Sequence, residues 1–210
     1  MEAILSELES LKGSSVSKAV SSRMKEFEAF RKADDDTLFS ELAFCLMTAN
    51  FQAEKSMKIQ EALGKQLISS SEERLARELK MHGHRFPNMR AAFIVEARKH
   101  RRGLRAKLDS FDDSHARRNW LVANVKGLGM KEASHFLRNV GYKGYAIIDF
   151  HIIDKLASAG LVDKPVSKSL TPKQYLEIEE VLKRLGERSN LSQAELDLYL
   201  WFAETGKVLK

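Results

Sequence analysis

The stretch Val125-Lys126-Gly127-Leu128-Gly129-Met130-Lys131-Glu132-Ala133-Ser134 decides the fold. Helical stripes of apolar residues flank it, over residues 120–122 on one side and 133–140 on the other. The pattern predicts two helices joined by a tight turn. Gly127 and Gly129 allow the backbone to turn sharply and to approach a ligand closely. Leu128 between them is expected to anchor the turn in the core.

Two interpretations of this turn are open. In one, it is a plain connection between two helices, with a glycine ending the first. In the other, it is a DNA-binding helix-hairpin-helix element over approximately residues 115–141. The backbone N–H groups that open the second helix would then face a DNA phosphate.

Helical periodicity runs through nearly the whole chain and predicts an all-α fold of eight to ten helices with no dominant sheet. We expect one fold over residues 1–210, in two helical lobes with a cleft between them. The polar loop Ser110–Ser114 is the expected seam between the lobes. The expected helix boundaries are Asp36, Ser70, Asn88, Thr171 and Ser192 as N-caps, a helix start in Ala146–Ile153, and Gly206 as a C-terminal glycine.

Composition excludes several classes of protein. Cys45 is the single cysteine, so an intramolecular disulfide and a cluster or zinc site built from several thiolates are excluded. No segment reaches the roughly 18 uninterrupted apolar residues that a membrane span needs. The three glutamates among residues 1–11 are unlike a signal peptide. We therefore expect an intracellular protein of the cytoplasm or nucleoid, without a membrane partner.

Positive charge is concentrated in one segment. Residues 80–107 hold nine basic residues and one acid, so this segment carries +8 while the whole chain carries +6. One interpretation is a solvated helix face. The other is a surface that meets DNA phosphates, for which Arg98 and Arg102 are the candidates.

An aspartate in an apolar run follows the hairpin. Asp149 lies eighteen residues after Lys131, in the apolar run Ile147-Ile148-Asp149-Phe150-His151-Ile152. An aspartate at the start of a helix is an N-cap in the simplest interpretation. Partial burial among apolar neighbours also suits a carboxylate that acts in chemistry, and both roles can coexist.

This segment resembles the DNA glycosylases of the helix-hairpin-helix–GPD superfamily, in which a lysine ends the hairpin and an aspartate follows about twenty residues later. Ala146-Ile147-Ile148 replaces the Gly/Pro that often precedes that aspartate. Within the superfamily, the chain is similar to the archaeal-type 8-oxoguanine DNA glycosylase/AP lyases from about residue 40 to its last residue. The segments that carry this similarity are Leu46–Phe51, Gly83–Phe86, Gly129–Gly141 and Leu196–Lys210.

The resemblance implies an enzyme that extrudes 8-oxoguanine from duplex DNA and attacks the sugar at C1′. Lys131 corresponds to the nucleophile, which forms a Schiff base with the sugar before β-elimination nicks the strand. The positive end of the helix dipole and burial beneath DNA would both favour its neutral form. Asp149 would stabilise the cationic sugar and accept a proton from Lys131.

The resemblance also implies a base pocket. Phe86 and Trp201 would stack on the flipped purine, although core packing is the simpler expectation for most aromatic residues. Lys210 would take part in base recognition. The lesion carries a hydrogen on N7 that guanine lacks, and a terminal carboxylate at Lys210 would accept it.

Other residues are expected to contact DNA. Asn50 would fill the space left by the flipped base, unless it is an ordinary buried residue at a helix end. The remaining DNA-binding candidates are Arg85, Gly127, Gly129 and His151. The resemblance further implies a monovalent cation on the backbone carbonyls of Ala123, Val125 and Leu128, with no metal held by side chains and no cofactor.

We thus expect a monomeric, bifunctional enzyme that acts on double-stranded DNA containing 8-oxoguanine. Two alternatives stay open: a non-catalytic module that binds DNA structure, and a glycosylase for a different lesion. Lys131 and Asp149 separate the enzyme from the binding module, because a module needs neither. The pocket residues separate one lesion from another.

Overall fold

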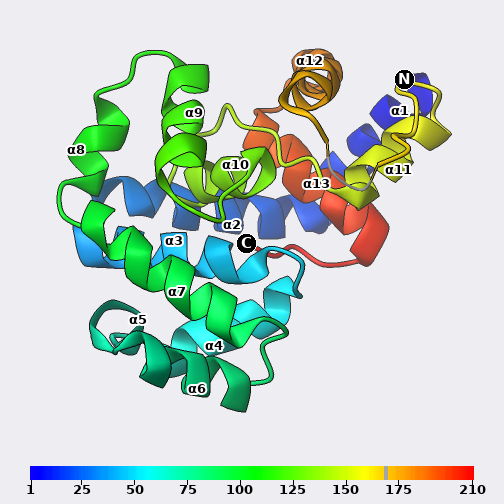
Figure 1. Cartoon of the computed structure of the whole chain (residues 1–210). Helices are drawn as coiled ribbons and strands as arrows, with labels where there is room; N and C mark the ends of the chain where they lie inside the picture. Colours follow the sequence, from blue (N-terminus) through cyan, green and yellow to red (C-terminus); the bar gives the residue numbers. More distant parts are fainter. Residues whose placement is uncertain (168–169) are drawn as a thin grey trace. The chain divides into compact units, whose positions relative to one another are not determined.

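The computed structural model describes residues 1–167 and 170–210 (Figure 1). Within these residues the chain forms thirteen α-helices and two short 3₁₀ segments, and no strand. The all-α prediction is confirmed, whereas the predicted number of helices is too low. Short helices such as α5 (Gln66–Ser69) and α8 (Leu104–Asp109) hold too few residues to show a periodic apolar stripe.

The chain divides into two compact units: residues 1–28 with 141–210, and residues 29–140. The expected seam at Ser110–Ser114 is wrong, because this loop lies inside the second unit. Its polar composition resembles that of a linker. However, the Arg117 guanidinium donates to the carbonyl of Leu108 at 2.8 Å and also to that of Phe111, which holds the loop against the following helix.

The unit of residues 29–140 is built around α3 (Asp35–Thr48), in which every residue from Glu41 to Thr48 is buried. Helices α4, α5, α7, α8 and α10 pack on α3, and α6 packs on α7 (Figure 1). The other elements of this unit are η1 (Phe30–Lys32), α4 (Ala53–Leu63), α6 (Glu72–Met81), α7 (Pro87–Ala97), η2 (Arg98–His100), α9 (Ser114–Asn124) and α10 (Met130–Asn139).

The other unit joins α1 (Glu2–Lys12) and α2 (Val16–Ala29) to α11 (Phe150–Ser158), α12 (Pro172–Ser189) and α13 (Gln193–Thr205). Helix α13 packs against α1, α11 and α12. The Lys155 ammonium of α11 pairs with Glu7 of α1 at 2.9 Å and with Glu204 of α13 at 3.0 Å. Burial tends to lower the pKa of Lys155, but its bonds to these two carboxylates outweigh burial and raise it.

The observed helix boundaries agree with the predicted caps where only one residue is a suitable candidate for the cap. Thr171 and Ser192 each form a capping box, and Gly206 ends α13 in the left-handed conformation. Asp36 is not a cap, because Asp34 accepts the N–H of Thr37 at 2.8 Å instead.

Two further caps lie beside their predicted positions. Ser71, and not Ser70, caps α6, because Ser70 already ends α5. Phe86, and not Asn88, precedes α7, because Pro87 fills the first helical position with its fixed φ. The predicted helix start in residues 146–153 is confirmed, since α11 begins at Phe150, within that run.

Candidate active site

The turn between α9 and α10 has the geometry that its glycines predict. Gly127 adopts a φ of +88°, in the left-handed region, and Gly129 is the extended N-cap of α10. Both glycines are exposed, whereas Leu128 is only 4% exposed and anchors the turn in the core as expected. The Leu128 N–H donates to the carbonyl of Val125 at 3.1 Å. The exposed backbone of the turn is therefore open to a ligand such as a phosphate.

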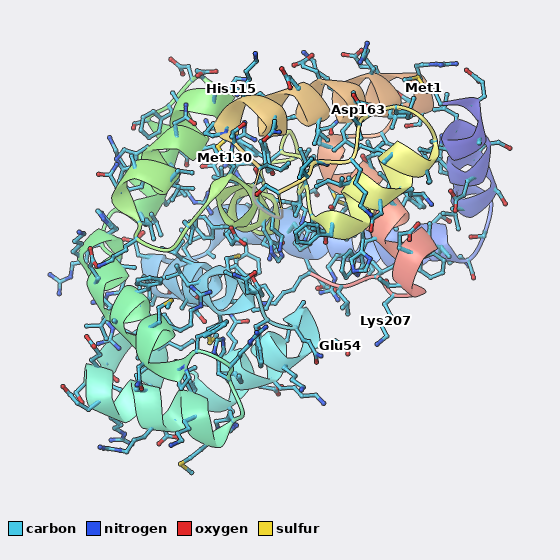
Figure 2. All side chains as sticks on the ribbon, turned by 45° about the vertical axis from the view of Figure 1, so that its right-hand side comes forward. Met1, Glu54, His115, Met130, Asp163 and Lys207 are labelled. Atoms are coloured by element: carbon cyan, nitrogen blue, oxygen red, sulfur yellow. The ribbon has the colours of Figure 1, made fainter. Side chains whose placement is uncertain are left out.

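Lys131 is the second residue of α10, directly after Met130 (Figure 2). It lies in the first turn, where the N–H groups lack partners within the helix and the dipole is positive. Its side chain is 32% exposed, and its Nζ lies 3.9 Å from Oε1 of Glu132. The Lys131 side chain is thus partly buried, at the positive end of a helix, with the Glu132 carboxylate nearby.

Asp149 is the N-cap of α11, as the sequence predicts, and its Oδ1 accepts the N–H of Ile152 at 3.0 Å. The preceding residues Tyr145–Ile148 are buried, and Asp149 itself is half-buried. The Tyr175 hydroxyl donates to the carbonyl of Ala146 at 2.8 Å and accepts the N–H of Ile148 at 3.4 Å. A buried tyrosine of α12 therefore fixes the segment that delivers Asp149.

His151 and Trp201 lie together in the same unit. Their rings make an edge-to-face contact, with centroids 5.0 Å apart, and His151 is exposed. Within the described part of the chain, the buried Nε1–H of Trp201 has no hydrogen-bond partner. Lys210 lies five residues beyond the end of α13, past Lys207 (Figure 2), and is half-exposed.

Phe86 and Arg85 lie in the loop between α6 and α7. Phe86 is half-exposed, and the guanidinium carbon of the exposed Arg85 lies 5.0 Å from the centre of its ring. The backbone N–H of Phe86 donates to Nδ1 of His84 at 3.1 Å. On its other side, the His84 ring bonds through Nε2 to the carbonyl of Met47 at 3.0 Å.

Asn50 follows the C-cap of α3 and is exposed, so the expectation of an ordinary buried asparagine is excluded. Its φ of +58° is left-handed, a conformation that asparagine tolerates better than most residues. Its side chain is thus presented on a tight turn directly after the most buried helix of the unit.

The basic segment of residues 80–107 is not one phosphate-binding face. Arg98 was expected to contact phosphate, but it caps α5: its Nε donates to the carbonyl of Leu67 at 3.0 Å and its Nη1 to that of Ser70 at 2.6 Å. Arg90 is buried, and Arg101 pairs with Asp36 at 2.6 Å. Arg102 is exposed and remains a candidate. Sequence could not separate these roles, because the carbonyl partners lie far away along the chain.

The candidates fall into two groups by unit. Residues 29–140 contain Asn50, Arg85, Phe86, Gly127, Gly129 and Lys131, whereas the other unit contains Asp149, His151, Trp201 and Lys210. Sequence reasoning missed Arg90, His84 and Tyr175, which contact the segments around these candidates. The one available signal for Arg90 is that it is a charged residue at a position of its helix that packs into the core.

No cluster of three or more His, Cys, Asp or Glu side chains suited to a metal occurs in the described residues. Backbone carbonyl oxygens are the other potential ligands, at the end of α9, where the sequence resemblance predicts a monovalent cation. Ala123 lies in the last turn, where carbonyls lack helical partners, and the Val125 carbonyl uses one lone pair on Leu128. Separately, no helix among the described residues is long and apolar enough to cross a membrane.

Comparisons with known proteins decide the family. A family model described as 8-oxoguanine DNA glycosylase, of the Ogg helix-hairpin-helix type, matches residues 20–191. The chain belongs to this family.

Relatives and solved structures in the glycosylase family match nearly the whole chain. A protein of Korarchaeum cryptofilum named 8-oxoguanine DNA glycosylase/AP lyase is 53% identical, over 95% of this chain and 94% of that protein. A Methanocaldococcus jannaschii protein of the same name is 43% identical, over 99% of each chain. The crystal structure of M. jannaschii 8-oxoguanine glycosylase/lyase with a 15mer DNA containing 8-oxoguanine has a TM-score of 0.95, at 42% identity over 99% of this chain and 100% of that one.

Proposed function

We propose that this glycosylase excises 8-oxoguanine from double-stranded DNA and then nicks the resulting abasic site. The observation that carries the proposal is Lys131, half-buried in the first turn of α10, directly behind the exposed glycine turn. Full-length relatives named 8-oxoguanine DNA glycosylase/AP lyase at 40–53% identity support the same activity. A DNA substrate supports an intracellular location for this activity.

The chemistry follows from an amine nucleophile. The neutral Nζ of Lys131 attacks C1′ of the extruded nucleotide, and the bond from C1′ to the base breaks as the base leaves. The attacking amine passes one proton to the departing base, and its second proton moves to O4′ as the C1′–O4′ bond breaks, which opens the ring and gives a Schiff base. β-Elimination then removes a C2′ proton and breaks the C3′–O bond, which nicks the strand.

Asp149 has two compatible roles in this scheme. Oδ1 accepts the Ile152 N–H at 3.0 Å, and the carboxylate has further lone pairs to offer. Placed near C1′, it would stabilise the positive charge that develops on the sugar and would accept a proton from Lys131. Its fixed orientation as an N-cap suits this work, because a preorganised charge need not rearrange during the reaction.

Recognition is assigned to the remaining candidates. Phe86 and Trp201 offer flat faces for stacking on the purine, and Lys210 contributes to base recognition. The backbone of Gly127 and Gly129 would bind a phosphate, with the cation at the carbonyls of Ala123, Val125 and Leu128 beneath it. The side chains of Asn50, Arg85 and His151 would contact DNA around the lesion.

Borohydride trapping on duplexes that carry one 8-oxoguanine tests the proposal. Borohydride reduces a Schiff base, so the native protein should form a covalent adduct and Lys131→Gln should form none. Asp149→Asn should fold and bind DNA, because asparagine still caps a helix, but should lose about 10²–10³-fold in base removal. A native protein that binds this DNA without reacting would be a binding module. Trapping only on another lesion would reassign the substrate.

A further inference from the structure

Arg90 of α7 is a buried charged residue that the scheme above does not use. It is 4% exposed, and its Nη2 donates to the carbonyl of Ala49 at 2.7 Å. Ala49 is the C-cap of α3 and directly precedes Asn50. The Ala49 carbonyl and the Asn50 N–H belong to one planar peptide group. A donor that fixes this carbonyl therefore also fixes the plane from which Asn50 projects.

The same guanidinium interacts with the helix that carries the nucleophile. Burial lowers the pKa of Arg90, and the charge of Glu132 on α10 opposes this effect. Glu132 is adjacent to Lys131, and its Oε1 lies 3.9 Å from the lysine Nζ. Its side chain is only 16% exposed, so its charge is screened weakly by water. The Glu132 carboxylate thus lies beside Lys131 and also within the electrostatic reach of Arg90.

We propose that Arg90 is a positioning residue that links the Asn50 turn to the catalytic end of α10, through the Ala49 carbonyl on one side and the Glu132 carboxylate on the other. The inference rests on the proposed function and names residues that position the groups of the same site. All of the residues involved belong to the unit of residues 29–140.

The hydrogen bond to Ala49 and the charge interaction with Glu132 have different consequences for the reaction. Without Arg90, the peptide between Ala49 and Asn50 loses its donor, and Asn50 no longer holds a fixed place opposite the lesion. The Glu132 carboxylate also loses the opposing charge of Arg90, which strengthens its attraction for the Lys131 ammonium. A bound ammonium does not attack C1′, so Schiff-base formation should require a higher pH.

Two double-mutant cycles test the link. The first combines Arg90→Met with Asn50→Gly and measures single-turnover removal of 8-oxoguanine opposite cytosine. Glycine adopts the left-handed φ of residue 50 without strain, so this change removes only the side chain. The second combines Arg90→Met with Glu132→Gln and measures the pH profile of borohydride trapping on a preformed abasic site.

We expect both cycles to be non-additive, by roughly tenfold, a size typical of residues that share a contact. In the first, Asn50→Gly should cost much less in the Arg90→Met background than in the native protein. In the second, Arg90→Met should move the trapping profile to higher pH, and Glu132→Gln should return it toward the native profile. Additivity in either cycle would overturn the link.

Controls separate this result from misfolding and from failure of the proposed function. Arg90→Lys, which keeps the charge and one donor, should stay close to the native protein in both readouts. Arg90→Gln, which removes the charge, repeats both cycles if Arg90→Met does not fold. Arg77→Met, an exposed change on α6 of the same unit, should leave both readouts at native values. Native protein that reacts normally in both assays establishes the activity whether or not the cycles show coupling.

Discussion

The ring of Phe93 on α7 lies directly against Gly127 in the hairpin. A Cβ built on Gly127 would stand 2.3 Å from Cδ2 of Phe93 and 2.7 Å from its Cε2, distances that real Cβ atoms do not show. The φ of +88° at Gly127 disfavours any other residue independently of this contact. Glycine is therefore required here for two physical reasons, and the aromatic ring is the reason that sequence does not reveal.

Gly127→Ala should be strongly harmful. Backbone strain and the collision with Phe93 together should lower the free energy of unfolding by roughly 2–4 kcal/mol. Binding to a duplex with an abasic site should weaken as well, because the turn must shift. Denaturant unfolding and a binding titration measure the two effects.

Gly103→Ala is the matched control for that change. Gly103 has a φ of +73°, but a Cβ there would meet nothing within 4 Å. It should therefore show the backbone strain alone, about 1–2 kcal/mol, and should leave DNA binding intact. Equal losses in the two variants would contradict a role for the Phe93 contact.

Local signals account for what the sequence predicts well. The start of α10 at the glycine turn and the N-cap role of Asp149 both depend on residues within a few positions of each other. The prediction of the N-cap failed where several equivalent candidates stand in a row, as in Asp34-Asp35-Asp36. Only the packing of the helix decides which carboxylate faces the free N–H groups.

Distant contacts account for the rest. Arg98 and Arg102 look alike in the sequence, but only Arg98 reaches the carbonyls of another helix. The Arg90 contact joins residues forty-one positions apart. No periodicity or spacing predicts such pairs, because they depend on how helices pack. Charge counting thus overestimated the number of arginines available to DNA.

Arg98→Ala and Arg102→Ala should have opposite signatures. Loss of the Arg98 guanidinium leaves the Leu67 and Ser70 carbonyls without donors, and should lower the free energy of unfolding by about 1–3 kcal/mol. Arg102→Ala should leave stability unchanged. If Arg102 touches a phosphate, its loss should reduce the slope of log affinity against log salt by about one. If the single change Arg98→Ala reduces the salt slope, the expectation that Arg98 contacts a phosphate is restored.

Deletion of Lys210, which removes both its side chain and its carboxylate, should separate base recognition from strand nicking. Lys210 lies beyond the C-cap of α13, so the helices should fold normally without it. Removal of 8-oxoguanine should fall by roughly five- to 150-fold, the size expected for a lost buried hydrogen bond. Nicking of a preformed abasic site needs no base and should persist. Single-turnover rates on the two substrates measure the difference, and an equal fall in both would assign Lys210 to DNA binding.

The surroundings of His84 lead us to expect a loss of stability in mild acid. Its Nδ1 accepts the N–H of Phe86, and its Nε2 lies 3.0 Å from the Met47 carbonyl, which requires a neutral ring with the proton on Nε2. Burial lowers the pKa of His84 below its ordinary 6.5, and the charge of Arg90 acts in the same direction, while the bond to Met47 opposes them. As the pH falls through about 6.5, His84 therefore becomes protonated in the unfolded chain but stays neutral in the folded one.

The sign of the effect follows from that difference in proton binding. Because the unfolded state binds more protons, the free energy of unfolding must fall as the pH drops below 6.5. Thermal or denaturant unfolding from about pH 7.5 to about pH 5.5 measures this fall. His84→Gln should be less stable at neutral pH and should lose less on acidification. His82→Gln, at the exposed neighbouring histidine, should keep the native pH dependence. If His84→Gln and the native protein lose stability in parallel, the proton uptake belongs to another group.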